Sequence, residues 1–254
     1  MSRERSLSRR TVTRLTAGAS TLGALAAGGA LGAFDLGDGG RTGQIGTDRE
    51  TVDLPDPETD GEVSVERAIA LRRSRREYTD EPLTLATLGQ LCWAMQGITQ
   101  SRVGRTDFRA APSAGATYPL ELFVAIDDRG VEDLGAGVYR YAPGDHALGR
   151  VRSGSVHDGI AGAALEQSWI ADAPIVVVLT AIDERTTERY GDRGSRRYVP
   201  MEAGHAAENL YLQAEALDLA TVVVGAFRDD DVRSLLDLSG QYRPLYVIPV
   251  GHRP

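Results

Sequence analysis

The sequence contains no lysine: all 28 of its basic residues are arginine. This absence excludes several chemistries. A Walker A loop places a lysine on nucleotide phosphates, and pyridoxal enzymes and S-x-x-K acyl enzymes use a catalytic lysine. Any phosphate or carboxylate that this chain binds is therefore held by arginine, backbone N–H groups or hydroxyls.

Cysteine and histidine are also scarce. Cys92 is the only cysteine, so neither an intramolecular disulfide nor a cysteine-rich zinc site can form. The four histidines are scattered, with no two spaced four apart as on one helix face, and we expect no metal site. A net charge of −8 argues against nucleic-acid binding, which needs a basic surface.

The N-terminus has the pattern of an export signal. Residues 1–14 carry five arginines against one acid, and residues 15–34 carry no charge. The run from Ser8 to Val12 (SRRTV) resembles a twin-arginine signal. We therefore expect residues 1–36 to direct export. The apolar stretch of about 20 residues is also long enough to stay as a membrane anchor; the alternative is a disordered basic tail followed by a short helix.

Residues 37–61 are rich in glycine, proline and acidic residues and show no apolar period, which predicts an exposed acidic linker. The folded domain then covers residues 62–254. With 42% hydrophobic and 25% charged residues in the whole chain, its composition is that of a soluble globular protein.

Within the domain, helices and strands do not alternate regularly, which predicts an α+β fold. Ser64 and Thr84 are expected to cap two helices, ending near Leu71 and Gly97. Residues 98–119 are expected to form a loop. Apolar periodicity predicts further helices at 155–165, 199–217 and 229–236, and strands at 120–126, 137–141, 147–151, 174–182, 221–225 and 242–250.

Three segments carry chemistry. The run from Arg72 to Arg76 (RRSRR) offers four guanidinium groups and a hydroxyl, which suits an anion, although a solvated basic helix end has the same pattern. Arg72 and Arg76 project together if the helix continues. Small residues in 109–119 (RAAPSAGATYP) let the backbone approach a flat ligand, or form a plain loop. Residues 222–227 (VVVGAF) are consistent with contact to a ring edge or with a strand end.

In this order the segments resemble the nitroreductase-like flavoproteins, and most of all the SagB/ThcOx-type dehydrogenases. The resemblance extends from about Asp53 to Pro254 and is specific because seven segments match in order. They are VDLP (52–55), RRSRR (72–76), LCWAMQGIT (91–99), APSAGATYPLELF (111–123), GVYRY (137–141), EAGHAAENL (202–210) and PVG (249–251).

The resemblance implies a nitroreductase-like α+β fold with a central mixed or antiparallel sheet flanked by helices, and a homodimer that binds FMN at the subunit interface. Ala116 stands where many nitroreductases have an asparagine, which fits the SagB-like branch. The FMN-binding residues that the resemblance implies are Arg72, Arg73, Ser74, Arg76 and Arg253 for the phosphate and ribityl chain, and Pro112, Ser113, Ala114, Gly115, Val224 and Gly225 for the ring.

Azoline-oxidising relatives use a Lys-Tyr pair for proton transfer, whereas this sequence offers Arg189-Tyr190 or Arg197-Tyr198. Arginine stays protonated and is a poor base, so azole formation on a ribosomal peptide is not expected. Tyr198 is the candidate catalytic proton donor; the alternative is a core or interface tyrosine.

The sequence therefore predicts an exported or membrane-anchored FMN-dependent oxidoreductase that acts on a small molecule or peptide. One alternative is an NAD(P)H-dependent nitro or quinone reductase, which export disfavours because nicotinamide cofactors are not expected outside the cell. The other is a non-enzymatic exported flavin-binding module.

Overall fold

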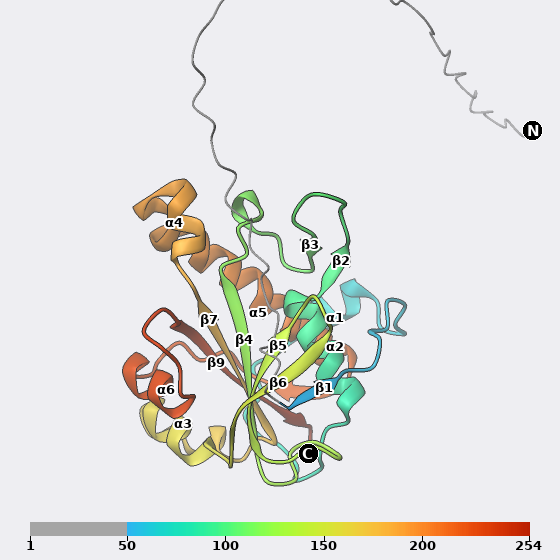
Figure 1. Ribbon diagram of the computed structural model, residues 1–254. Helices are drawn as coiled ribbons and strands as arrows, with labels where there is room; N and C mark the ends of the chain where they lie inside the picture. The colour runs from blue at the N-terminus through green and yellow to red at the C-terminus, as the bar shows by residue number, and fades with distance from the viewer. Residues whose placement is uncertain (1–49) are drawn as a thin grey trace, which may run out of the picture. The chain divides into compact units, whose positions relative to one another are not determined.

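The computed structural model describes residues 50–254, in which helices cover both faces of a seven-stranded sheet (Figure 1). The predicted signal, anchor and most of the predicted linker lie outside the described residues. None of the helices in the described part is long and apolar enough to cross a membrane.

The strands follow the order β1-β6-β5-β4-β7-β9-β8, and every neighbouring pair is antiparallel. A separate two-stranded hairpin, β2-β3, lies outside this sheet. The strands are β1 (Thr51–Asp53), β2 (Ile98–Gln100), β3 (Phe108–Arg109), β4 (Leu120–Ile126), β5 (Gly137–Ala142), β6 (Ala147–Ser153), β7 (Ile175–Ala181), β8 (Leu219–Thr221) and β9 (Arg243–His252).

Every residue of the central strands β4 and β7 is buried. Since successive side chains of a strand point to opposite sides of the sheet, both faces of these strands are covered. Leu122 and Val124 belong to the core that includes residues of the helices α2 (Leu85–Gln96) and α5 (Val199–Ala216). Phe123 and Ala125 belong to a second core with residues of α3 (His157–Ala163) and α6 (Asp229–Leu235). The fold therefore has two apolar layers, and the predicted α+β class with an antiparallel sheet is confirmed.

The helix caps are those that the sequence predicts. The side chain of Ser64 accepts from the backbone N–H of Arg67 at the start of α1, and Thr84 accepts from Thr87 at the start of α2. The helices are α1 (Val65–Leu71), α2 (Leu85–Gln96), α3 (His157–Ala163), α4 (Glu184–Tyr190), α5 (Val199–Ala216) and α6 (Asp229–Leu235).

Two predicted boundaries are wrong. Thr51–Asp53, assigned to the linker, form β1 and pair with β6, so the domain begins before residue 62. The strand predicted at 221–225 ends at Thr221, and beyond it only Val224 forms a bridge, to Val247. At Val223 the backbone N–H bonds a tyrosine hydroxyl instead of a neighbouring strand.

Two local structures were not predicted. The expected loop at 98–119 contains the β2-β3 hairpin and a 3-10 turn at Ala114–Ala116. Between β7 and α5 the chain forms α4 and then a π-helical turn at Gly194–Tyr198. The sequence of α4, ERTTERY, has no apolar stripe, which explains why periodicity did not indicate it.

Candidate functional site

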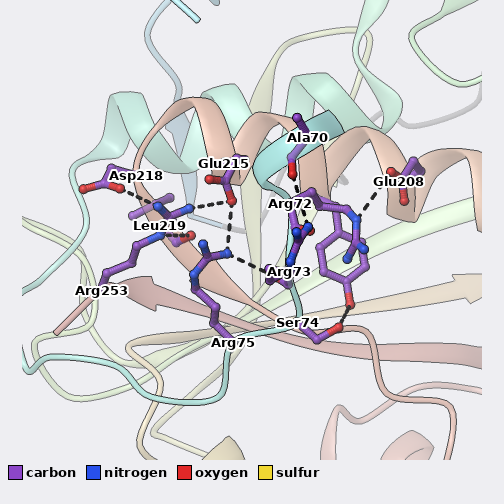
Figure 2. A network of polar contacts seen from close by, with 11 residues as sticks. Ala70, Arg72, Arg73, Ser74, Arg75, Glu208, Glu215, Asp218, Leu219 and Arg253 are labelled. Carbon is purple, nitrogen blue, oxygen red and sulfur yellow. Dashed lines mark hydrogen bonds and ion pairs between the residues drawn. The ribbon is translucent and has the colours of Figure 1, made fainter. Parts of the chain in front are cut away.

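Helix α5 connects the segments that the sequence analysis singled out. Along this helix Glu202, Glu208, Tyr211 and Glu215 contact the small-residue loop, the arginine-rich segment and the C-terminal end of the chain. The contacts at the Glu208 to Glu215 end are drawn in Figure 2. Because one rigid helix carries all four side chains, the segments are held in a fixed order along its axis.

Tyr211 joins two of the three segments. Its hydroxyl lies 3.0 Å from the Ser74 hydroxyl and accepts the backbone N–H of Val223 at 2.9 Å. Since the Val223 contact uses only an acceptor site, the phenolic proton is available for Ser74. The guanidinium of Arg72 lies over the Tyr211 ring, 5.0 Å from its centroid. Sequence reasoning missed Tyr211, which directly follows the EAGHAAENL segment.

The arginine-rich segment is not helical. Helix α1 ends at Leu71 and Arg72 is extended, with ψ of 123°, so Arg72 and Arg76 do not share a helix face. Arg73 turns back and donates to the carbonyls of Ala70 (3.2 Å) and Arg72 (2.7 Å) (Figure 2). Arg76 is exposed and lies over the ring of Trp169, and within residues 50–254 no carboxylate forms an ion pair with it.

Arg253 belongs to a separate ion-pair network. Its guanidinium donates to Glu215 at 2.7 Å, to Asp218 at 2.6 Å and to the carbonyl of Leu219 at 3.0 Å (Figure 2). Arg75 contacts the same Glu215 oxygen at 3.1 Å. The network fastens the end of the chain to the end of α5. The structure thus places Arg253 beside Arg75, both with carboxylate partners, whereas Arg76 has none among residues 50–254. The contact of Arg253 with a phosphate stays a prediction.

The small-residue loop meets α4 at Gly115. This glycine has φ of 64°, and a Cβ there would lie 2.5 Å from the Tyr190 hydroxyl. Arg189 donates to the Gly115 carbonyl at 3.2 Å. Of the two Arg-Tyr pairs in the sequence, the structure therefore brings Arg189-Tyr190 to the loop. Tyr198 packs edge-on against Tyr190, with centroids 5.0 Å apart, and accepts from Arg193.

The rest of the loop is partly open. Pro112 is exposed, Ala114 is half-buried, and the Ser113 hydroxyl accepts the backbone N–H of Tyr118 at 2.9 Å. On the other segment Val224 is buried and paired with Val247, while Gly225 is exposed. Each predicted ring-contact segment therefore combines a fixed backbone with an exposed small or cyclic residue.

A buried polar cluster lies behind the loop, and sequence reasoning missed it. Burial raises the pKa of Glu202 to about 7, against the opposing effects of a Ser113 hydrogen bond and of Arg109. Burial also lowers the pKa of Arg109, whose guanidinium donates to Gln96 at 2.9 Å and lies over the Tyr118 ring. Glu202 falls among the apolar residues of the inner face of α5, and that position was the available signal.

Comparison with known proteins identifies the family. The model of the nitroreductase family matches residues 69–252, and the chain belongs to this family. A protein of Methanocaldococcus jannaschii that is named as a nitroreductase is 46% identical over 207 residues, which cover 81% of this chain and 98% of that protein.

Two further matches agree with the fold and the branch. A crystal structure of a nitroreductase-family protein from Ralstonia eutropha covers 84% of this chain and 93% of its own, with a TM-score of 0.70 and 28% identity. The microcin B17-processing protein McbC of Escherichia coli is 30% identical over 135 residues, which cover 51% of this chain and 48% of McbC. These matches confirm the resemblance to the SagB-like branch and support a flavin-type oxidoreductase in general terms.

Proposed function

We propose that the protein is an FMN-dependent oxidoreductase of the SagB/ThcOx or nitroreductase type, acting on a small molecule or peptide. The observation that carries the proposal is the joining of Ser74, Val223 and Arg72 around Tyr211, because it assembles distant segments that the family resemblance assigns to FMN.

The residues present suit a ligand with an anion at one end and a flat ring at the other. At one end the Ser74 hydroxyl and the Arg72 guanidinium meet at Tyr211, and Arg76, two residues beyond Ser74 in the chain, offers a further guanidinium; hydroxyl and guanidinium donors bind phosphate well. At the other end lies the loop at 112–115. Glu202 and Tyr211, which mark the two ends, are nine residues apart on α5, or about 14 Å along the axis.

FMN supplies the redox chemistry when bound, while the protein binds and orients it. The position of Tyr190 against Gly115 favours its hydroxyl over that of Tyr198 as the proton donor to substrate at the loop. The guanidinium of Arg189, beside it, donates to the Gly115 carbonyl and offers hydrogen-bond donors but no acceptor. This arrangement supports reduction or oxidation of a substrate other than a peptide azoline.

We also propose that the protein is a homodimer. We further propose that its twin-arginine-like signal directs export and is then either cleaved or kept as a membrane anchor through residues 15–34. An exposed apolar pair on α1 supports the dimer, since Val65 is 64% and Ile69 57% exposed on consecutive turns of one helix.

The test is the absorbance of the purified full-length protein. We expect a flavin spectrum or uptake of added FMN, and substrate-dependent reduction or reoxidation of the flavin. The proposal would be refuted if the purified protein contained no flavin and did not take up added FMN. Rapid bleaching by NADPH would favour the nitro or quinone reductase, and bound flavin without turnover by any donor would favour the non-enzymatic module.

A further inference from the structure

An arginine-rich segment lies beside the loop assigned to the flavin ring. Residues 184–198, which include α4 and the π-helical turn, contain five arginines and three acidic residues, in a chain whose net charge is −8. Two of the arginines form ion pairs, Arg185 with Glu121 and Arg196 with Asp192. In the described part of the chain the other three form none: Arg189, Arg193 and Arg197. This surface therefore carries positive charge without carboxylate partners, next to a candidate substrate site.

The arginine side of α4 faces the loop. Arg185 donates to the carbonyl of Tyr118 at 3.0 Å, and Arg189 donates to the carbonyl of Gly115 at 3.2 Å. Figure 1 shows α4 beside the 3-10 turn at Ala114–Ala116. Because Arg189 is exposed, its guanidinium lies at the boundary between the loop and solvent. A ligand that lies on the loop therefore has this cation at its edge.

The guanidinium groups of Arg189 and Arg193 keep most of their donors for a ligand. A guanidinium has five N–H donors in a planar fork. Arg189 uses one at the Gly115 carbonyl, and the Nε atom of Arg193 donates to the Tyr198 hydroxyl at 2.9 Å. No other hydrogen bond of either group involves residues 50–254. The remaining donors match the two oxygens of a carboxylate, which arginine binds with two parallel hydrogen bonds.

Two tyrosines hold these arginines in place. The rings of Tyr190 and Tyr198 pack edge-on, with centroids 5.0 Å apart. The guanidinium of Arg189 lies 5.4 Å from the Tyr190 centroid, and that of Arg193 lies 5.7 Å from the Tyr198 centroid. Tyr198 ends a π-helical turn, an irregularity that is frequent at functional sites. Since a free arginine side chain loses rotamer freedom when it binds, the contacts with the two rings lower the cost of binding a ligand.

We propose that Arg189 and Arg193 bind a carboxylate of the substrate, and that the protein therefore acts on a small molecule that bears a carboxylate. This inference rests on the proposed function, because the rest of the substrate must lie against a flavin ring at the 112–115 loop. The two arginines select the substrate by its charge and orient it, and they take no part in proton transfer.

The experiment is a titration of the full-length protein, saturated with FMN, with benzoate and with its neutral counterpart benzamide. Isothermal titration calorimetry measures the two affinities, and flavin absorbance reports whether the ligand lies at the ring. Benzoate should bind roughly tenfold or more tightly than benzamide, because a charge-assisted contact forms only with the carboxylate, and it should shift the flavin bands. Added salt should reduce this preference, because the arginines are exposed and their charges are screened.

The variants test the arginines one at a time. Arg189→Gln should abolish most of the preference for benzoate and leave the affinity for benzamide unchanged, and Arg193→Gln should reduce the preference by less, because Arg193 contacts Tyr198 rather than the loop. Arg189→Lys keeps the charge but loses the planar fork, so its preference should be intermediate. The matched control is Arg196→Gln. It removes the same charge from the same segment, but Arg196 already pairs with Asp192 and should not contribute.

The outcomes distinguish this proposal from the one on which it rests. A wild type that takes up no FMN overturns the proposed function and, with it, the role of the two arginines in selecting its substrate. With FMN bound, equal affinities for benzoate and benzamide, benzoate binding that leaves the flavin bands unchanged, or an equal loss of preference in Arg189→Gln and Arg196→Gln overturns this proposal alone. Circular dichroism checks folding; should Arg189→Gln not fold, an unchanged preference in both Arg189→Lys and Arg193→Gln also overturns it.

Discussion

The hydroxyl groups of Ser74 and Tyr211 lie 3.0 Å apart, although 137 residues separate them in the chain. The contact fixes the arginine-rich segment against α5, and the same tyrosine oxygen also holds the backbone of Val223. One side chain thus contacts both segments, which are also joined by the backbone hydrogen bond from the N–H of Arg75 to the carbonyl of Thr221.

Tyr211→Phe should weaken both the site and the fold. The change removes both hydrogen bonds and leaves the N–H of Val223 without its partner, which costs about 1–2 kcal/mol. We expect FMN affinity to fall roughly tenfold and the free energy of unfolding to fall by that amount, measured by flavin titration and urea denaturation. Tyr242→Phe, at a partly buried tyrosine that packs against the core of α3 and α6, is the control; an equal loss in both would contradict the prediction.

Arg76→Ala should weaken FMN binding with little effect on stability. Arg76 has no carboxylate partner among residues 50–254, so its removal breaks no ion pair and takes away a cation for the phosphate. A charge-assisted contact contributes about 1.5–3 kcal/mol, or roughly 10- to 100-fold in affinity. Riboflavin, which lacks the phosphate, should bind the variant and the wild type equally. Unchanged FMN affinity would exclude Arg76 from the site.

Gly115→Ala should disturb the loop more than its backbone conformation alone explains. Gly104 has nearly the same φ, 67° against 64°, but a Cβ there meets no atom within 4 Å. Gly104→Ala therefore measures the left-handed strain, of order 1 kcal/mol. Gly115→Ala adds the clash with Tyr190, and we expect it to lower the free energy of unfolding by about 1 kcal/mol more than Gly104→Ala does. Equal melting temperatures for the two variants would show that Tyr190 moves freely.

Glu215→Gln should destabilise the C-terminal end of the domain. Arg75 and Arg253 share this carboxylate. Without its charge the two guanidinium groups keep a single carboxylate partner among the described residues, Asp218, which pairs with Arg253. Because both arginine side chains are partly exposed, we expect about 1–3 kcal/mol rather than the larger loss of a fully buried pair. Urea denaturation at low and high salt measures this decrease in the free energy of unfolding. A decrease that disappears at high salt would indicate that the ion pairs of Glu215 are only surface pairs.

Stability should depend on pH through Glu202. Its pKa is raised from 4.5 to about 7 in the folded protein, so between these values the folded state holds a proton that the unfolded chain releases. The stability it contributes is fully present below pH 4.5 and is lost as the pH rises to 7, by roughly 2–3 kcal/mol.

The matching measurement is urea denaturation of the wild type and Glu202→Gln at several pH values. The variant should gain stability relative to the wild type through this window and keep a constant difference above it. Profiles that run parallel would contradict the raised pKa.

Patterns that depend on the local chain predicted the fold well. The apolar runs of β4 and β7 and the caps at Ser64 and Thr84 are local, and the structure contains them nearly as expected. Contacts between distant segments could not be predicted in this way. The β-branched side chain of Val223 predicts a strand, but its backbone N–H donates to the hydroxyl of Tyr211. Nothing near Val223 in the sequence indicates that partner.

The same limit applies to the site. Ser74 and Gly115 were named from short motifs, whereas Glu202 and Tyr211, on α5, connect those motifs to the rest of the molecule. Their importance depends on burial and on partners far away in the chain. The ion pair between Arg253 and Glu215 could not be predicted from the sequence. It joins the end of a strand to the end of a helix, and such a contact leaves no periodic pattern in the sequence.

The place of β9 in the sheet has a consequence for biosynthesis. β9 lies between β7 and β8 and supplies the bridge to Val224, and the Arg253 that pairs with Glu215 follows it. A chain is made from its N-terminus, so α5, β8 and Val224 are synthesised before the strand and the arginine that they contact. These segments therefore wait for β9 before the sheet can close, and they are exposed to other partners until then.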